Sequence, residues 1–87
     1  MVKVERAIVT LRFPFHEEEM DIEMPVFLPV EEICEKVLEL LICQQPHRYG
    51  GIANVDLFWN GKKLDKQTNL AEHGIWDGSI LDIALKK

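Results

Sequence analysis

Cysteine is scarce in this chain, and its spacing excludes a disulfide framework. The two cysteines, Cys34 and Cys43, fall in a segment whose pattern predicts one helix. On a helix they would lie about 13 Å apart along the axis and on opposite faces. A disulfide needs Cα atoms within roughly 7 Å. We therefore expect two reduced thiols, which is typical of a cytoplasmic protein.

Clustered basic charge and long hydrophobic runs are also absent. The formal net charge is −5 and no Lys/Arg run exceeds two residues, which disfavours nucleic-acid binding, because phosphates need a clustered basic surface. Charged residues are spread through residues 1–6 and no long apolar run follows them, so no signal peptide is expected. The longest nearly uncharged run, residues 24–30, contains two prolines and is too short to cross a bilayer. We expect a cytoplasmic protein without membrane insertion.

The sequence shows no arrangement that predicts catalysis or a metal site. A nucleophile needs a base and an orienting group, and the Cys43/His47 pair has no third partner. The same pair and the scattered histidines fall short of the four ligands of structural zinc. The acidic residues 17–19 lack the alternating ligands of an EF-hand, and Gly50-Gly51 lacks the lysine of a P-loop. We predict a non-enzyme with no cofactor and no metal.

The composition that remains is that of a small globular protein. The chain has 87 residues, of which 47% are hydrophobic and 29% charged. These proportions are typical of soluble domains. A chain of this length buries roughly 60–65% of the surface that its unfolded form exposes. We expect residues 1–87 to form one domain around one hydrophobic core.

Two stretches near the start of the chain alternate between apolar and polar residues. Within residues 4–13, every second side chain from position 7 onward is apolar, and within residues 19–24 every second side chain from position 20 onward is apolar. A period of two is typical of a half-buried strand. A proline follows the first stretch and ends it, which leaves residues 15–18 as the connection. The two strands are predicted to form an N-terminal hairpin.

One helix is predicted to begin at Val30 and to end near residues 43–45. Its apolar residues recur at helical spacing, and acidic residues occupy its early turns, where they suit the positive end of the helix dipole. Pro46 forbids its continuation. Residues 44–54 are then predicted to form a loop, with the Gly-Gly pair as its flexible centre.

The second half carries two turn signals between short strands. Residues 55–59 alternate, and Asn60-Gly61 gives the strongest hairpin signal, because a type I′ turn needs positive φ at both central residues. A short strand, a brief helical turn and the Asp77-Gly78 turn lead to a closing strand. This order predicts an α+β, β-grasp (ubiquitin-like) fold: a four-to-five-stranded mixed sheet packed on one helix. Trp59 is expected to face inward, with a predicted core of Val9, Leu11, Phe13, Ile22, Met24, Ile33, Val37, Leu41, Leu57, Leu64, Leu70, Ile75, Leu81 and Ile83.

Two parts of the sequence resemble known families. The pattern of the second half of ubiquitin is followed by residues 62–64, Leu70, residues 74–75 and residues 80–83. The step Pro25-Val26-Phe27-Leu28-Pro29-Val30, which ends a strand and leads into the helix, resembles the YukD/EsaB family. These are small bacterial ubiquitin-like proteins encoded with type VII secretion systems. The resemblance covers nearly the whole chain, and the length of the 44–54 loop departs from it.

This resemblance implies a non-catalytic accessory or regulatory protein of a type VII secretion system that acts by protein–protein binding. Membrane components of the system or its cytoplasmic ATPase are the implied partners. Two alternatives stay open: a generic ubiquitin-like adaptor, and a protein modifier or sulfur carrier. The sequence given ends at Leu85-Lys86-Lys87, without the Gly-Gly that such carriers activate, so the carrier alternative needs a longer precursor.

Strand alternation also predicts candidate binding residues on the sheet face that points away from the helix. Ile8, Phe58 and Ala84 point outward from strands that are neighbours in a β-grasp. Phe58 falls where the resemblance places the central patch residue of ubiquitin, with Asp82 beside it. Single exposed apolar residues are normal, so contiguity would make these residues a partner surface. Trp76 is a further candidate, for which half-burial against the core is the favoured explanation.

Overall fold

Five strands and one long helix build the fold of the computed structural model, which describes residues 6–13 and 18–87. The strands are β1 (Arg6–Phe13), β2 (Glu18–Pro25), β3 (Asn54–Trp59), β4 (Lys62–Lys63) and β5 (Ile80–Lys86), and the helices are α1 (Val30–Gln44), α2 (Pro46–Tyr49) and the 3-10 turn Ala71–His73. Apart from α2, the elements follow one another along the chain in the order predicted from the sequence.

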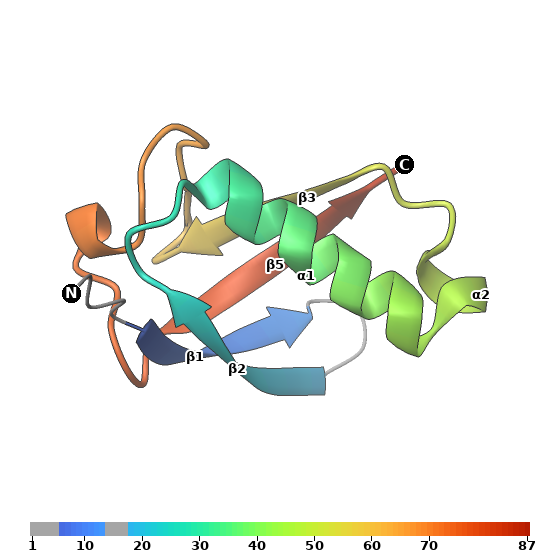
Figure 1. The fold of residues 1–87 in the computed structure, drawn as a ribbon, viewed down its shortest axis with the longest axis horizontal. Helices are drawn as coiled ribbons and strands as arrows, with labels where there is room; N and C mark the ends of the chain where they lie inside the picture. Colours follow the sequence, from blue (N-terminus) through green and yellow to red (C-terminus); the bar gives the residue numbers. More distant parts are fainter. Residues whose placement is uncertain (1–5, 14–17) are drawn as a thin grey trace, which may run out of the picture.

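The strands form one mixed sheet in the order β2-β1-β5-β3-β4, and α1 lies across one face of it (Figure 1). β1 and β5 are parallel at the centre, and the other neighbouring pairs are antiparallel. A parallel pair needs a long crossover connection between its strands, and the chain between β1 and β5 includes α1 and β3. The predicted ubiquitin-like β-grasp is confirmed.

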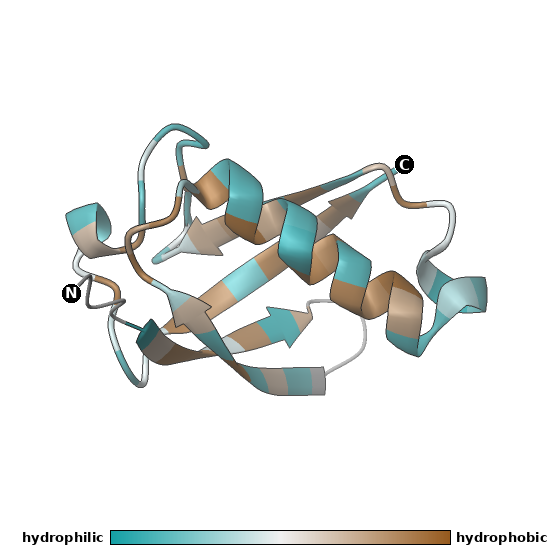
Figure 2. Cartoon of the chain, viewed as in Figure 1, coloured by the Kyte–Doolittle hydropathy of each residue, from teal (hydrophilic) through white to brown (hydrophobic). Residues whose placement is uncertain are grey.

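The predicted periodicities account for the two sides of the sheet. In β1, alternate residues from Ala7 to Phe13 are buried, as a strand with one covered face requires. α1 buries residues from Val30 to Leu41 at helical spacing against that face. Figure 2 shows the resulting bands of hydrophobic and hydrophilic residues along β1 and α1. The two hydrophobic faces meet to form the core.

The predicted core is confirmed except at Ile22, which is only partly buried. β2 is a terminal strand of the sheet, so α1 covers its inner face less fully. Trp59, expected in the core, packs against it but is also only partly buried, since it is the last residue of β3, beside the two-residue edge strand β4. The structure adds buried residues that the predicted core lacked: Ala7, Val26, Val30, Cys34, Tyr49 and Val55.

The first backbone amides of α1 are hydrogen-bonded by backbone carbonyls of another segment rather than by a capping side chain. Pro29 precedes the helix and makes no side-chain cap. Instead, the Val30 amide donates to the carbonyl of Thr68 at 2.7 Å, and the Glu31 amide donates to that of Lys66 at 3.1 Å. The first amides of a helix lack partners within it. The segment after β4 therefore fixes the helix to the sheet.

The Asn60-Gly61 hairpin forms as predicted, with φ of 53° at Asn60 and 80° at Gly61. Residues 14–17 of the predicted N-terminal connection lie outside the described residues. Glu18 was also assigned to that connection, and this was wrong: it opens β2, where it pairs with Phe13.

The prediction of a loop for residues 44–54 was wrong in part, because this stretch contains α2. Pro46 ends α1 and at the same time begins α2, a position that suits proline because no intrahelical amide bond is needed there. Tyr49 at the end of α2 is 3% exposed and belongs to the core. The segment is therefore anchored by its aromatic side chain.

The two glycines after α2 are predicted to respond differently to alanine. A Cβ at Gly50 would lie 2.5 Å from the carbonyl oxygen of Pro46, whereas nothing lies within 4 Å of a Cβ at Gly51. Gly50→Ala should destabilise the fold by about 1–2 kcal/mol through this crowding. Gly51→Ala should change stability by about 0.5 kcal/mol or less. Urea unfolding of both variants measures the two losses of stability, and equal losses would contradict this prediction.

Candidate protein-binding surface

The sheet face opposite α1 carries the candidate residues predicted from the sequence. We call this side the outer face. The strand registers place Thr10 opposite Ile80 and Phe58 opposite Asp82. The outer face includes these outward-pointing residues of the three middle strands: Ile8, Thr10, Arg12, Asp56, Phe58, Ile80, Asp82 and Ala84.

The predicted candidates differ in their exposure. Ile8 is 52% exposed, and Phe58 and Ala84 are partly buried. Trp76 is 42% exposed, so it is roughly half-buried and still offers aromatic surface to a partner.

Ile80 is an outer-face residue that the sequence reasoning missed. It is 45% exposed and begins β5. Because Phe58 pairs with Asp82, Ile80 is the diagonal neighbour of Phe58, within reach of an aromatic side chain. The alternation of β5 was a usable signal, since inward Leu81 and Ile83 require Ile80 to point outward. Ile80 thus joins the predicted candidates on β1 and β3.

Trp76 is held close to β1 by the turn that precedes β5. The Ile8 amide donates to Asp77 Oδ1 at 2.7 Å, and the Gly78 amide donates to the carbonyl of Ile8 at 3.0 Å. The Ser79 amide donates to the carbonyl of Trp76 at 3.1 Å and closes the turn. The register places Ile8 and Ile80 at the same end of the outer face, and this turn brings the backbone of Trp76 close to that end.

An ion pair divides the outer face. Arg12 Nε donates to Asp82 Oδ1 at 2.6 Å and its second nitrogen donates to Oδ2 at 3.2 Å. The hydrogen bond to Asp82, with the charge of that carboxylate, raises the pKa of the Arg12 guanidinium. Asp82 also lies opposite Phe58. The pair therefore separates the Ile8 and Ile80 end from Ala84.

Asp56 is the one buried charged residue of the described part of the chain, and it is 4% exposed. Three ammonium groups surround it: Lys86 at 3.0 Å, Lys66 at 3.4 Å and Lys63 at 3.7 Å. Burial alone would raise the pKa of Asp56, but the positive charges of these lysines outweigh it and lower the pKa below its usual value. Asp56 therefore remains a carboxylate that anchors a basic edge beside Phe58.

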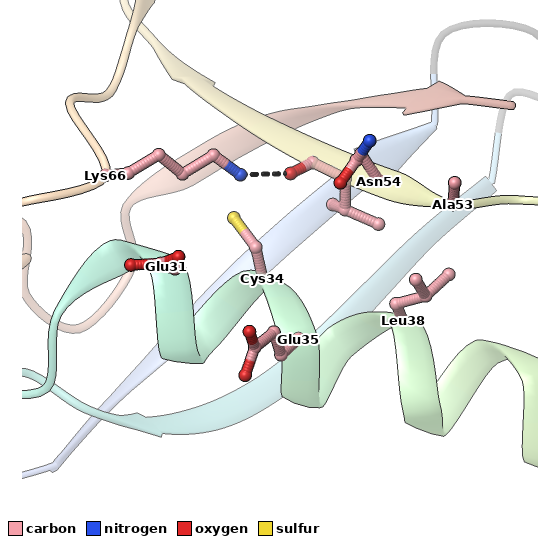
Figure 3. Close-up of a pocket in the computed structure, with 8 residues that line it drawn as sticks. Glu31, Cys34, Glu35, Leu38, Ala53, Asn54 and Lys66 are labelled. Carbon is pink, nitrogen blue, oxygen red and sulfur yellow. Dashed lines mark hydrogen bonds between the residues drawn. The ribbon is translucent and has the colours of Figure 1, made fainter.

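A cavity of about 170 Å³ lies between α1 and the edge of β3 (Figure 3). Lys66 Nζ donates to the carbonyl of Val55 at 2.6 Å, and the Cys34 thiol points toward the same lysine. Burial raises the pKa of Cys34, and Lys66 offsets only part of this effect. A buried thiol with a raised pKa is a poor nucleophile. The cavity therefore offers no activated cysteine.

Within residues 6–13 and 18–87, no three His, Cys, Asp or Glu side chains gather in a way that could hold a metal ion. Both cysteines are free: Cys34 is buried and Cys43 is exposed. No helix of this described part is long and apolar enough to cross a membrane.

The order of strands, the single crossing helix and the exposed outer face define the chain as a ubiquitin-like domain. It belongs to the YukD family, described as WXG100 protein secretion system (Wss), protein YukD, whose model matches residues 6–83. The resemblance inferred from the sequence is thereby confirmed. The chain is a ubiquitin-like domain of a family that belongs to type VII secretion. A comparison with curated protein sequences found no match.

Solved structures share the fold at low sequence identity. The EccD5 ubiquitin-like domain from Mycobacterium xenopi is 16% identical over 95% of this chain and 97% of that chain, with a TM-score of 0.73. The ubiquitin-like domain of the Mycobacterium tuberculosis type VII secretion system protein ECCD1 is 19% identical over 92% and 98%, with a TM-score of 0.71. A chain of the MycP5-free ESX-5 inner membrane complex is 17% identical over 92% and 21%, with a TM-score of 0.72.

Proposed function

We propose that this protein is a non-catalytic docking subunit of a type VII secretion system and binds a protein partner through its outer face. The observation that carries the proposal is the apolar group of Ile8, Trp76 and Ile80, which are 52%, 42% and 45% exposed, with Phe58 diagonal to Ile80. Adjacent exposed apolar residues with a polar rim mark interaction sites on soluble proteins. Aromatic side chains contribute strongly to such interfaces.

The partner we propose is a membrane component of the secretion system or its cytoplasmic ATPase. We propose that the binding takes place in the cytoplasm. Family membership supports the secretion context. The similarity to one part of a chain in an inner membrane complex supports the kind of assembly. The unpaired cysteines agree with a reducing compartment. Lysines around Asp56 favour a partner that brings acidic residues to the β3 and β4 end of the outer face.

The proposal also holds that binding is non-covalent. The rival readings are a generic adaptor outside secretion and a modifier or sulfur carrier processed from a longer precursor. The mass of the native protein and of its complexes separates these readings. Isopeptide-linked adducts or a C-terminal thiocarboxylate would establish the carrier, whereas partners released by salt or detergent would support docking.

Phe58→Asp is the variant that tests the outer face. A buried charge at the centre of an interface costs several kcal/mol when it meets no partner, so we expect at least a tenfold loss of partner recovery. The measurement is affinity capture of the tagged protein from cytoplasm and solubilised membrane, followed by mass spectrometry. Phe27→Asp is the matched control, since Phe27 is 58% exposed but lies in the connection between β2 and α1.

The outcome depends on which variant loses the partner. Docking through the outer face is supported if folded Phe58→Asp loses the partner and folded Phe27→Asp keeps it. Retention of every secretion partner by folded Phe58→Asp shows that the outer face is not the interface. Recovery of partners unrelated to secretion favours the generic adaptor.

A further inference from the structure

β2 ends the sheet and presents an unpaired backbone edge in the described structure. It has eight residues and pairs with β1 one to one from Glu18 to Pro25. An edge strand exposes alternate N–H and C=O groups that can pair with another chain. Natural edges are usually shortened, bulged or protected by lysine. β2 is long and regular, and the proline occupies only its last position.

An apolar groove runs between this edge and α1. Its walls come from the inner side of β2 and from one side of the helix, with Lys36 and Glu23 as its charged members. The hollow measures about 60 Å³, which is room for a small aliphatic side chain but well below the roughly 300 Å³ of ligand pockets. The apolar lining consists of Ile22, Met24, Pro25, Ile33 and Val37.

The other side of β2 is acidic. Glu19, Asp21 and Glu23 alternate with Met20, Ile22 and Met24 and are exposed, and Glu23 also borders the groove. Asp21 accepts a hydrogen bond from Thr10 at 2.6 Å, and Glu23 lies 3.5 Å from Arg6. A strand added to β2 would place alternate side chains on these two sides. One set would meet aliphatic walls and the other an acidic row.

We propose that β2 accepts an extended segment of a partner protein in which aliphatic residues alternate with lysine or arginine. The aliphatic side chains enter the groove beside Ile22 and Met24, and the basic side chains pair with the acidic row. Main-chain hydrogen bonds to the free edge supply affinity, and the alternating side chains supply specificity.

Charge selects this occupant over a second copy of the chain. Pairing of two β2 edges would set the acidic rows of both copies opposite each other, and like charges directly opposite destabilise a strand pair. A basic strand gains from the same row. The site is separate from the outer-face group around Phe58, because β2 and β3 lie at different places in the sheet order, with β1 and β5 between them.

A fluorescent peptide of alternating valine and lysine, with the eight residues of β2 as its length, is the probe. The controls are alternating valine and glutamate, and a block peptide with the same valine and lysine content. Fluorescence anisotropy gives the affinity for the full chain. Two further peptides carry N-methyl groups on the valines only or on the lysines only. One of the two should lose binding at least tenfold and the other should retain it, because only alternate amides face the edge.

The double variant Glu19→Lys/Glu23→Lys tests the acidic row. This variant should bind the valine–lysine peptide at least tenfold more weakly than the wild type does. Glu35→Lys/Glu72→Lys makes the same change in net charge at exposed positions outside β2 and should leave binding within twofold. Phe58→Asp should also leave it unchanged, so failure of this proposal and failure of the outer-face proposal are distinguishable. Amide hydrogen exchange should show new protection in β2.

Several results would overturn the proposal. The first is absence of binding by the valine–lysine peptide. The second is equal binding of the glutamate peptide, the block peptide or both N-methylated peptides, which would show attraction without strand pairing. The third is protection of β2 that rises with protein concentration alone, which would make a second copy the occupant. Protection confined to the outer face around Phe58 would also contradict it.

Discussion

Leu81→Ala is expected to lower the free energy of unfolding by about 3 kcal/mol, because it leaves a cavity at the centre of the core. Leu81 is 0% exposed and lies opposite Leu11 in the parallel pair of β1 and β5. For a domain of this size, such a loss should lower the melting temperature by roughly 12–24 °C. Calorimetry and urea unfolding measure both quantities.

Ile80→Ala is the matched control for Leu81, one residue earlier on the same strand. Ile80 is 45% exposed on the outer face, so its truncation should cost less than about 1 kcal/mol. Similar losses for the two variants would contradict the assignment of the two faces of β5. Partner capture with Ile80→Ala then reports on the outer face without the complication of unfolding.

Asp56→Asn should destabilise the protein by about 2 kcal/mol at neutral pH. Removing one partner from a buried ion pair costs about 3–5 kcal/mol when both partners are buried. Here the loss is smaller, because the side chains of Lys63, Lys66 and Lys86 keep exposed fractions of 51%, 33% and 58% and remain partly solvated. Urea unfolding at pH 7 measures the difference, which added salt should reduce.

The stability contributed by Asp56 should also depend on pH. The surrounding lysines hold its folded-state pKa below its usual value, which is about 4 in unfolded chains. The folded state therefore binds the proton more weakly than the unfolded state, and the contribution is fully present above the unfolded pKa. It is lost as the pH falls through the folded pKa. The difference in the free energy of unfolding between wild type and Asp56→Asn should thus narrow as the pH drops from 7 toward 2.

Asp82→Asn is the control for Asp56. Its ion pair with Arg12 lies on the outer face, with side-chain exposed fractions of 36% and 50%. Solvent weakens such pairs, so this variant should lose far less stability than Asp56→Asn. The role assigned to the buried carboxylate would be contradicted if Asp82→Asn lost more stability than Asp56→Asn. It would also be contradicted if the stability difference between wild type and Asp56→Asn widened at acid pH.

Much of the fold could be predicted because its signals are local. The period of two in β1, the helical spacing of α1 and the Asn60-Gly61 turn depend on residues close in sequence. The helix α2 was missed because a four-residue helix has no periodicity to detect, and Tyr49 is buried through contacts with distant residues. That residues 1–87 form one independent domain stays a prediction.

The candidate site was only partly predictable for a related reason. Alternation placed Ile8, Phe58 and Ala84 on the outer face, but their partner function stays a prediction. The alternation of β3 does not reveal the burial of Asp56, because that burial depends on Lys63, Lys66 and Lys86, which lie outside that strand.

The sequence by itself determined the strands, the main helix, the turns and the family, because hydrophobic period and turn chemistry are properties of neighbouring residues. The tertiary structure alone decided which side chains from distant segments meet. It set Ile80 beside Phe58, surrounded Asp56 with lysines and left β2 as an open edge beside an apolar groove. These arrangements follow from strand order and register, since a shift of one residue would turn every side chain to the other face.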